Sequence, residues 1–292
     1  MTTSRPSKFV EHAPAKVNLT LAVLDRRADG YHLLDSLVVF ADAGDRLTLT
    51  PGGPLSLHLR GVTAKQAGPV ESNLVLKAAK ALASEIPNLK LGRFTLDKRL
   101  PVAAGLGGGS SDAAAALRLL ARANRLKLND KRLLKVAGGV GADVPVCVDP
   151  RPRRMRGIGE KLSEPLAIPK LAAVLVNPGV AVSTKDVFAL LDLEPGAAKP
   201  VRRAGVLPRA RDDLIAFLAG ECNDLEPAAI KLQPAIARVL MALRQEDGCD
   251  LARMSGSGAT CFGLFTSSRA AAAAARHLAA ARPRWWVKAT VF

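Results

Sequence analysis

Hydrophobic and polar residues follow patterns that alternate along the chain between those of strands and those of helices. Runs rich in β-branched residues and leucine over residues 17–24 and 36–40, separated by a turn with Asp and Gly, predict a β-hairpin. Apolar residues at helical spacing predict helices over residues 73–83 and 112–124, with a short strand over 93–96 before the second helix.

The second half of the chain continues this mixture. Apolar runs predict strands over residues 171–176 and 285–292, and apolar residues at helical spacing predict helical stretches over 228–245 and 269–281. Strands and helices do not alternate regularly, which favours an α+β fold over a doubly wound parallel sheet.

Two proline- and arginine-rich stretches predict surface loops, over residues 149–169 and 194–211. The first is expected to be a solvated basic loop at a domain boundary. The sequence therefore predicts two domains, residues 1–167 and 168–292.

Charge and cysteine content narrow the classes of protein to consider. The formal net charge of +16 fits a nucleic-acid surface, a site for anionic small molecules, or a charge bias without functional meaning. Aromatic residues make up 4% and are not interleaved with Lys and Arg, which weakens the nucleic-acid interpretation.

The cysteines are far apart, without metal-ligand spacing, and predict free thiols in a reducing cytoplasm. No export signal or membrane span is expected.

The feature of the sequence that points most directly to chemistry is a glycine-rich loop, residues 101–111, which leads into the helix predicted over residues 112–124. Glycines allow close approach of the backbone to a ligand, and the first N–H groups of a helix point toward an anion, so this arrangement predicts a phosphate cradle. Ser110 and Ser111 either cap the helix or donate to phosphate oxygens. A glycine cluster alone also fits a plain turn.

Four familiar explanations of the loop fail on its sequence. The chain has no Gly-Lys dipeptide, which a P-loop requires, and Ser110 stands where a dinucleotide-binding motif ends in glycine. The signatures of protein kinases and the G-x-S-x-G elbow of hydrolases are absent from the sequence.

Three segments, residues 14–19, 101–111 and 254–259, together resemble the GHMP kinases, the family of galactokinase, homoserine kinase and mevalonate kinase. The resemblance implies a two-lobe α+β fold, with an N-terminal lobe like domain 2 of ribosomal protein S5 and a ferredoxin-like C-terminal lobe. It also implies an ATP-dependent kinase for a small alcohol.

Residues 27–32, 141–145 and 157–160 are most similar to the branch of the family whose acceptor is a cytidine diphosphate-linked methylerythritol, in the non-mevalonate route to isoprenoids. The resemblance implies phosphorylation of its 2-hydroxyl, with ATP and Mg²⁺ as cofactors. Both substrates are anionic, in keeping with the basic charge.

By this resemblance Lys16 and Asp143 are the catalytic pair: Asp143 takes the hydroxyl proton, and Lys16 stabilises the developing charge. The residues implied in nucleotide binding are Asn73, Lys98, Pro101, Val102, Ala103, Ala104, Gly105, Leu106, Gly107, Gly108, Gly109, Ser110 and Ser111. Those implied in acceptor binding are Asn18, Tyr31, His32, Asp143, Thr184 and Phe188, with Tyr31 and Phe188 flanking the cytosine. No protein-built metal site is expected, and Ser111 is the candidate hydroxyl ligand for Mg²⁺.

Two alternatives stay open. One is a GHMP kinase for another alcohol such as mevalonate or homoserine, against which Tyr31 and His32 argue because those substrates have no cytosine. The other is a nucleic-acid-binding protein that shares the S5-like lobe, which predicts RNA affinity that falls steeply with salt. The sequence does not predict an oligomeric state.

Overall fold

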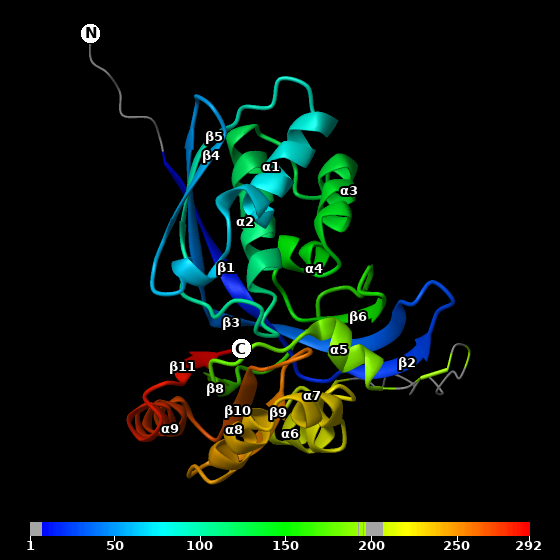
Figure 1. Cartoon of the computed structure of the whole chain (residues 1–292), viewed down its shortest axis with the longest axis vertical. Coiled ribbons are helices and arrows are strands. Elements are labelled where there is room, and N and C mark those ends of the chain that lie inside the picture. The colour runs from blue at the N-terminus through cyan, green and yellow to red at the C-terminus, as the bar shows by residue number, and fades with distance from the viewer. Residues whose placement is uncertain (1–7, 192, 195, 197–206) are drawn as a thin grey trace. The chain divides into compact units, whose positions relative to one another are not determined.

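The computed structural model describes residues 8–191, 193–194, 196 and 207–292 (Figure 1). The chain forms two compact units. Unit 1 contains the described residues up to Ala15, Gly44–Val102 and Gly107–Pro150, and unit 2 contains Lys16–Ala43, Ala103–Leu106 and the described residues from Arg151 to the C-terminus. None of the helices in the described ranges has the length and apolar character needed to cross a membrane.

Unit 1 combines strands with a group of helices that cover one side of them in Figure 1. Strand β5 (Gly92–Asp97) pairs antiparallel with the C-terminal part of β3 (His32–Pro51) and parallel with β4 (Ser56–Arg60). Strand β1 (Phe9–Asn18) begins in this unit and also pairs with β3. The helices are α1 (Leu74–Glu85), α2 (Gly108–Ala123), α3 (Lys131–Val140), α4 (Val144–Val148) and the short 3₁₀ helices η1 (Ala64–Gln66) and η2 (Val70–Ser72).

Capping and apolar packing explain why the chain forms α1 and α2, the helices that precede and follow the glycine loop along the chain. Asn73 caps α1, because its side-chain oxygen accepts the N–H of Val75 at 2.9 Å. The apolar stripe of α1 is buried against α2, where Ala113–Ala116 are fully buried and allow close approach of the two helices. The helices predicted for these segments are confirmed.

Unit 2 is built around a four-stranded antiparallel sheet of β8 (Ala172–Asn177), β9 (Cys249–Met254), β10 (Cys261–Phe265) and β11 (Trp286–Val291), in the order β11-β8-β10-β9. Numbered within the sheet this order is 4-1-3-2, the ferredoxin-like arrangement that the family resemblance implied. The remaining elements of the unit are β2 (Ala22–Arg26), β6 (Arg153–Gly157), β7 (Lys161–Leu162), α5 (Thr184–Ala189), α6 (Arg211–Ala219), α7 (Glu226–Leu232), α8 (Ala235–Arg244) and α9 (Ser268–Ala281).

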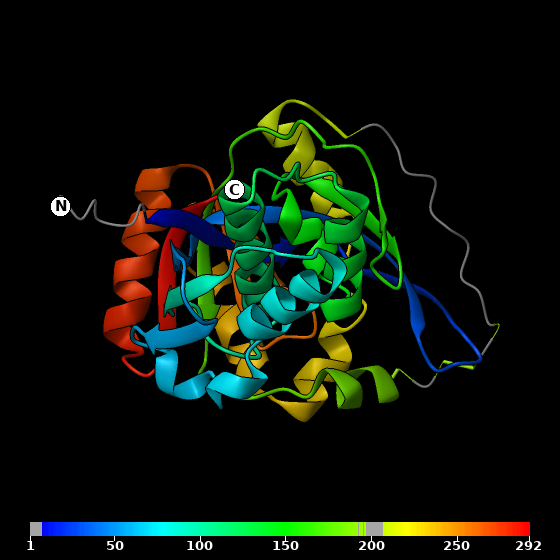
Figure 2. The same ribbon diagram turned by 90° about the horizontal axis from the view of Figure 1, so that it is seen from above.

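The core of unit 2 lies between this sheet and its helices. Val174 and Val176 of β8 are fully buried with Ile236 and Leu240 of α8, and Leu278 brings α9 into the same cluster. Figure 2 shows α9 running alongside β11, with which it packs. Each buried side chain of this kind contributes roughly 1.5–3 kcal/mol, so the cluster is the main source of stability for the unit.

Outside the sheet, the predicted hairpin is confirmed and a predicted loop is corrected. Strands β2 and β3 pair antiparallel from Ala22↔Asp35 to Arg26↔His32. The basic stretch after residue 149 is not simply a solvated loop, because β6 pairs with β3 and places Arg154 and Arg156 on the carboxylate of Asp35, at 3.2 and 2.9 Å. This neutralisation lets an arginine-rich segment form a strand.

The loop predicted over residues 194–211 lies mostly outside the described residues. The division into two domains after residue 167 stays a prediction.

Candidate active site

The base of the glycine loop in unit 1 is held by a buried ion triad. Lys98 is 4% exposed, and its ammonium lies 2.5 Å from Asp45 Oδ2 and 2.7 Å from Asp112 Oδ2. The other oxygen of Asp45 accepts the N–H groups of Arg99 and Leu100, at 2.6 and 2.9 Å. Asp45 therefore connects the residues that lead into the loop, and Lys98 connects them to Asp112 beyond it.

Two carboxylates share one ammonium in this triad, so the charges do not balance. Burial raises the pKa of Asp112 to about 8, and the negative charge of Asp45 adds to this effect while Lys98 opposes it. Burial disfavours the charged form of Lys98, but the carboxylates of Asp112 and Asp45 outweigh it and raise the pKa of the ammonium. The two shifts favour the protonated form of the Asp112 carboxyl and the charged form of the Lys98 ammonium.

Helix α2 begins inside the glycine-rich segment. Its N-cap is Gly107 at φ 59°, a left-handed conformation that favours glycine, and no side chain caps the helix. The first turn thus leaves backbone N–H groups free for an anion. Ser111 Oγ and Asp112 Oδ1 are buried here without a hydrogen-bond partner among the described residues. Unpartnered buried polar atoms beside a free helix N-terminus are typical of a site that a polar ligand completes.

In unit 2, residues 103–106 of the loop pack against the turn between β9 and β10. Ser255 Oγ donates to Gly105 O at 2.9 Å and accepts the N–H of Asn18 at 3.2 Å, and Thr260 N donates to Ala104 O at 3.1 Å. A Cβ on Gly105 would lie 2.3 Å from Ser255 O, so only glycine fits. The third motif of the sequence analysis is therefore in direct contact with the second.

The residues predicted to bind the acceptor belong to unit 2 with the exception of Asp143. His32 and Phe188 stack, with ring centroids 4.7 Å apart, whereas Tyr31 is 59% exposed. Burial and the nearby charge of Arg26 lower the pKa of His32, which favours a neutral imidazole. Thr184 Oγ1 lies 2.8 Å from Ser257 Oγ, which ties α5 to the same turn.

The two predicted catalytic residues come from different elements. Lys16 is 4% exposed on β1, and its backbone N–H donates to Leu106 O at 2.9 Å. Asp143 is half-buried at the N-cap of α4. Asn18 donates to Ser36 Oγ at 2.7 Å, and its own Oδ1 is buried without a partner in the described part of the chain. The amide oxygen of Asn18 is therefore available to a bound molecule.

Comparisons with known proteins identify the family of the chain. The family model described as GHMP kinases N terminal domain matches residues 73–149, and that described as GHMP kinases C terminal matches residues 208–283. A 4-diphosphocytidyl-2-C-methyl-D-erythritol kinase of Xanthobacter autotrophicus is 56% identical over 284 residues, 96% of this chain and 97% of the relative. The chain belongs to the GHMP kinase family.

Further relatives agree with that assignment. A kinase of the same name from Rhodopseudomonas palustris is 54% identical, and the match covers 99% of both chains. A crystal structure of 4-(cytidine 5'-diphospho)-2C-methyl-D-erythritol kinase superposes on this GHMP kinase with a TM-score of 0.76 at 35% identity, covering 97% of this chain and 99% of that one. Homoserine kinase from Cytophaga hutchinsonii, at 21% identity and a TM-score of 0.69, covers 100% and 95% and shares the fold. The protein is thus an ATP-dependent small-molecule kinase.

Some residues that build the site of this GHMP kinase were not among those predicted. Asp45 lies more than 50 residues before its partner Lys98 and carries no local motif. Asp112 directly follows Ser111, so its position next to the loop was the available signal. The structure also begins α2 at Gly108, four residues before the predicted start at residue 112, so Gly108–Ser111 of the predicted loop form the first turn of the helix.

The raised pKa of Asp112 predicts a pH dependence of stability. Between about pH 4 and pH 8 the folded state of the kinase keeps a proton on Asp112 that the unfolded state releases, so stability falls as pH rises through this window. Asp112→Asn should remove that slope, which for one group reaches at most about 1.4 kcal/mol per pH unit. Urea unfolding at pH 5, 6, 7 and 8 measures it.

Asp130 provides the matched control for this experiment. Its hydrogen bonds with Arg132 lower its pKa to about 2, so it titrates below the window and Asp130→Asn should keep the wild-type slope. An unchanged slope in Asp112→Asn would show that Asp112 is ionised in the folded protein.

Proposed function

We propose that this GHMP kinase transfers the γ-phosphoryl group of ATP to the 2-hydroxyl of 4-diphosphocytidyl-2-C-methyl-D-erythritol. The observation that carries the proposal is the identity of 52–56% over nearly the whole chain with kinases of that name from several bacteria. The stacked His32–Phe188 pair supports it, because it provides an aromatic surface on which a nucleobase can be bound.

The catalytic pair in this proposal is Lys16 and Asp143. Asp143 accepts the proton of the acceptor hydroxyl, and Lys16 stabilises the negative charge that develops on the oxygen. Phosphoryl transfer needs little covalent help from the protein, so positioning and electrostatics supply most of the rate.

ATP is bound by residues 101–111 together with Asn73 and Lys98. The free N–H groups at the start of α2 support a phosphate contact for the second half of the loop. Asn73 caps α1 through its side-chain oxygen, which leaves its amide N–H groups for the nucleotide. Lys98 is bound by the carboxyl groups of Asp45 and Asp112, so it supports ATP binding first by holding the loop base.

Mg²⁺ accompanies ATP in this reaction and neutralises the triphosphate when bound. The unpartnered, buried hydroxyl of Ser111 fits a role as one oxygen ligand. The described residues contain no cluster of three or more His, Cys, Asp or Glu side chains that could hold a metal ion, so phosphate and water oxygens would supply the other ligands. All four cysteines are in reduced form in the described part of the chain, which supports a reducing cytoplasm as the compartment. The partners in this proposal are small molecules rather than nucleic acid or a membrane.

One assay tests the acceptor. The protein is incubated with ATP, Mg²⁺ and either the cytidylylated methylerythritol, mevalonate or homoserine, and ADP release is measured. Turnover only with the cytidylylated acceptor is expected. Turnover with mevalonate or homoserine would instead assign a different acceptor within the family, and salt-sensitive RNA binding without turnover would favour the nucleic-acid alternative.

The aromatic residues near the acceptor predict a selective effect on KM. Stacking of a base on an aromatic side chain is worth about 1–3 kcal/mol, so Tyr31→Ala should raise the acceptor KM roughly five- to a hundredfold while the KM for ATP stays unchanged. Tyr31→Phe keeps the ring and should cost far less. Because Tyr31 is 59% exposed, neither variant should lower the melting temperature much. An unchanged acceptor KM in Tyr31→Ala would exclude stacking on this ring.

A further inference from the structure

The turn between β9 and β10, residues 254–259, contacts both the glycine loop and Asn18, and it contains two glycines with positive φ angles. Gly256 and Gly258 have φ angles of 56° and 88°, a region that glycine enters freely, so the sequence of the turn permits many conformations. Yet Ser255 holds Gly105 of the loop and Asn18. Two backbone hydrogen bonds close the turn, from Ser255 N to Thr260 O at 2.9 Å and from Gly258 N to Ser255 O at 3.0 Å, but neither uses the carbonyl oxygens of Met254 and Gly256 on the two sides of Ser255. Those carbonyls require a donor from elsewhere in the unit.

Asn223 fulfils that requirement. It is 3% exposed, and its Nδ2 donates to Met254 O and to Gly256 O, at 2.8 Å each. Its Oδ1 accepts the N–H of Leu225 at 3.0 Å. Both N–H groups of the amide are thus used on carbonyls of the turn, one on each side of Ser255.

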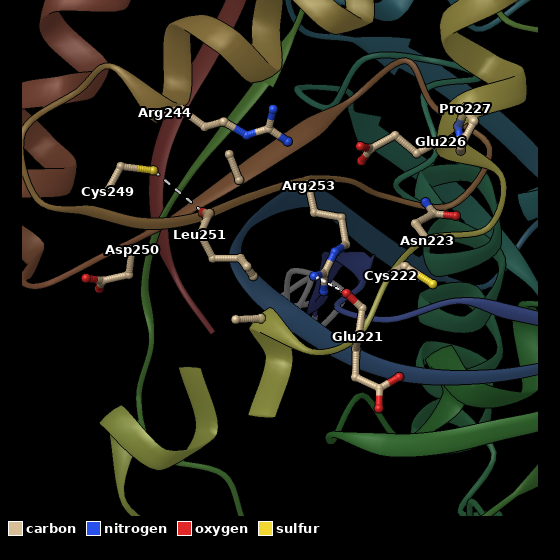
Figure 3. A pocket seen from close by; sticks show the side chains of 12 residues that line it. Glu221, Cys222, Asn223, Glu226, Pro227, Arg244, Cys249, Asp250, Leu251 and Arg253 are labelled. Atoms are coloured by element: carbon tan, nitrogen blue, oxygen red, sulfur yellow. Dashed lines mark hydrogen bonds between the residues drawn. The ribbon is translucent and has the colours of Figure 1, made fainter. Parts of the chain in front are cut away.

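The segment that carries Asn223 is itself fixed. Leu21 and Asn223 form a parallel β-bridge, in which Leu21 N donates to Cys222 O at 2.9 Å and Asp224 N to Leu21 O at 2.8 Å. Glu226, at the start of α7, accepts the N–H of Met254 at 2.8 Å. Figure 3 shows Asn223 and Glu226 at the same end of a pocket of about 470 Å³ that the segment lines.

We infer that Asn223 is a positioning residue, which holds the turn 254–259 so that Ser255 places Gly105 and Asn18 for ATP and acceptor. The inference rests on the proposed roles of the glycine loop and Asn18. It also explains why an amide is needed: an aspartate here would direct a carboxylate at the two carbonyl oxygens that now accept from N–H groups, and it would repel them.

The test is steady-state kinetics on Asn223→Ala and Asn223→Asp, with a melting curve on each. A displacement of about 1 Å at a reacting group can cost about a hundredfold in rate, so kcat/KM for ATP and for the acceptor should fall about ten- to a hundredfold in both variants. Hydrogen exchange should quicken at the amides of Gly258 and Thr260, which bond Ser255 O and Ala104 O in the wild type.

Asn124 offers a matched control in unit 1. Its Nδ2 donates to Lys90 O and Leu120 O, at 3.0 and 2.9 Å, and its Oδ1 accepts the N–H of Lys90 at 2.7 Å. Asn124→Ala therefore loses the same three kinds of hydrogen bond and should lower the melting temperature with both KM values and kcat unchanged.

The outcomes separate the proposals. Wild-type kcat and KM in a folded Asn223→Ala, with only a lower melting temperature as in Asn124→Ala, would overturn the positioning role. If Asn223→Ala does not fold, Asn223→Ser keeps one donor and the same criteria apply to it. If the wild-type protein turns over no cytidylylated acceptor, the proposed acceptor fails by itself, and the affinity of each variant for a non-hydrolysable ATP analogue, measured by calorimetry, still tests Asn223.

Discussion

Asp143→Asn is expected to lower kcat by at least about a hundredfold while the protein stays folded. The amide has the size of the carboxylate but cannot take up the hydroxyl proton, and general-base catalysis commonly contributes a hundredfold or more. Because ATP contacts other residues in the proposal, the KM for ATP should change little. Steady-state kinetics with the cytidylylated acceptor, together with a melting curve, measures both effects.

Asp130 again provides a control, since it is another N-cap aspartate of unit 1. It caps α3 by accepting the N–H of Arg132, and an asparagine there can cap equally well. Asp130→Asn should therefore keep wild-type kcat. A near-normal rate in a folded Asp143→Asn protein would remove Asp143 from the role of base and leave only a structural role at the start of α4.

Much of the fold could be predicted because its signals are local. The apolar stripe of α1, the alanine-rich interior of α2 and the apolar run of β8 are each contained in a short stretch of sequence, where periodicity determines the element. The run of the glycine loop into a helix start could be predicted for the same reason, since both are adjacent in sequence, whereas phosphate binding by the loop stays a prediction. The roles of Lys16 and Asp143 depend on family resemblance and stay predictions.

Features that depend on distant residues could not be predicted from local patterns. Asp45 meets Lys98 and Asp112 only because β3 and β5 pair and α2 follows them, and Asn223 meets the turn at Gly256 only in the folded unit. The basic residues of β6 suggested a solvated loop because the carboxylate that neutralises them, Asp35, lies on another strand. Long-range pairing of polar groups leaves no periodic signal in the sequence.

Gly105→Ala is expected to weaken binding of a non-hydrolysable ATP analogue by about a hundredfold or more. The residue has a φ of 75°, and a Cβ would lie 2.3 Å from Ser255 O and 2.9 Å from Gly258 O, so either the loop or the turn must move. Left-handed strain costs about 1–2 kcal/mol and overpacking about 1–3 kcal/mol, and about 1.4 kcal/mol corresponds to a factor of ten. Calorimetry with the analogue and Mg²⁺ measures the loss.

Two glycines separate the causes of that loss. Gly53 has a φ of 80° with open space around its Cβ position, so Gly53→Ala introduces the backbone strain without the clash and should keep wild-type affinity for the analogue. Gly138 lies within α3 and is also uncrowded, so Gly138→Ala should stabilise the protein by about 1 kcal/mol at unchanged affinity. If Gly105→Ala binds the analogue as tightly as these two variants, contact between residues 103–106 and the turn at Ser255 has no part in ATP binding.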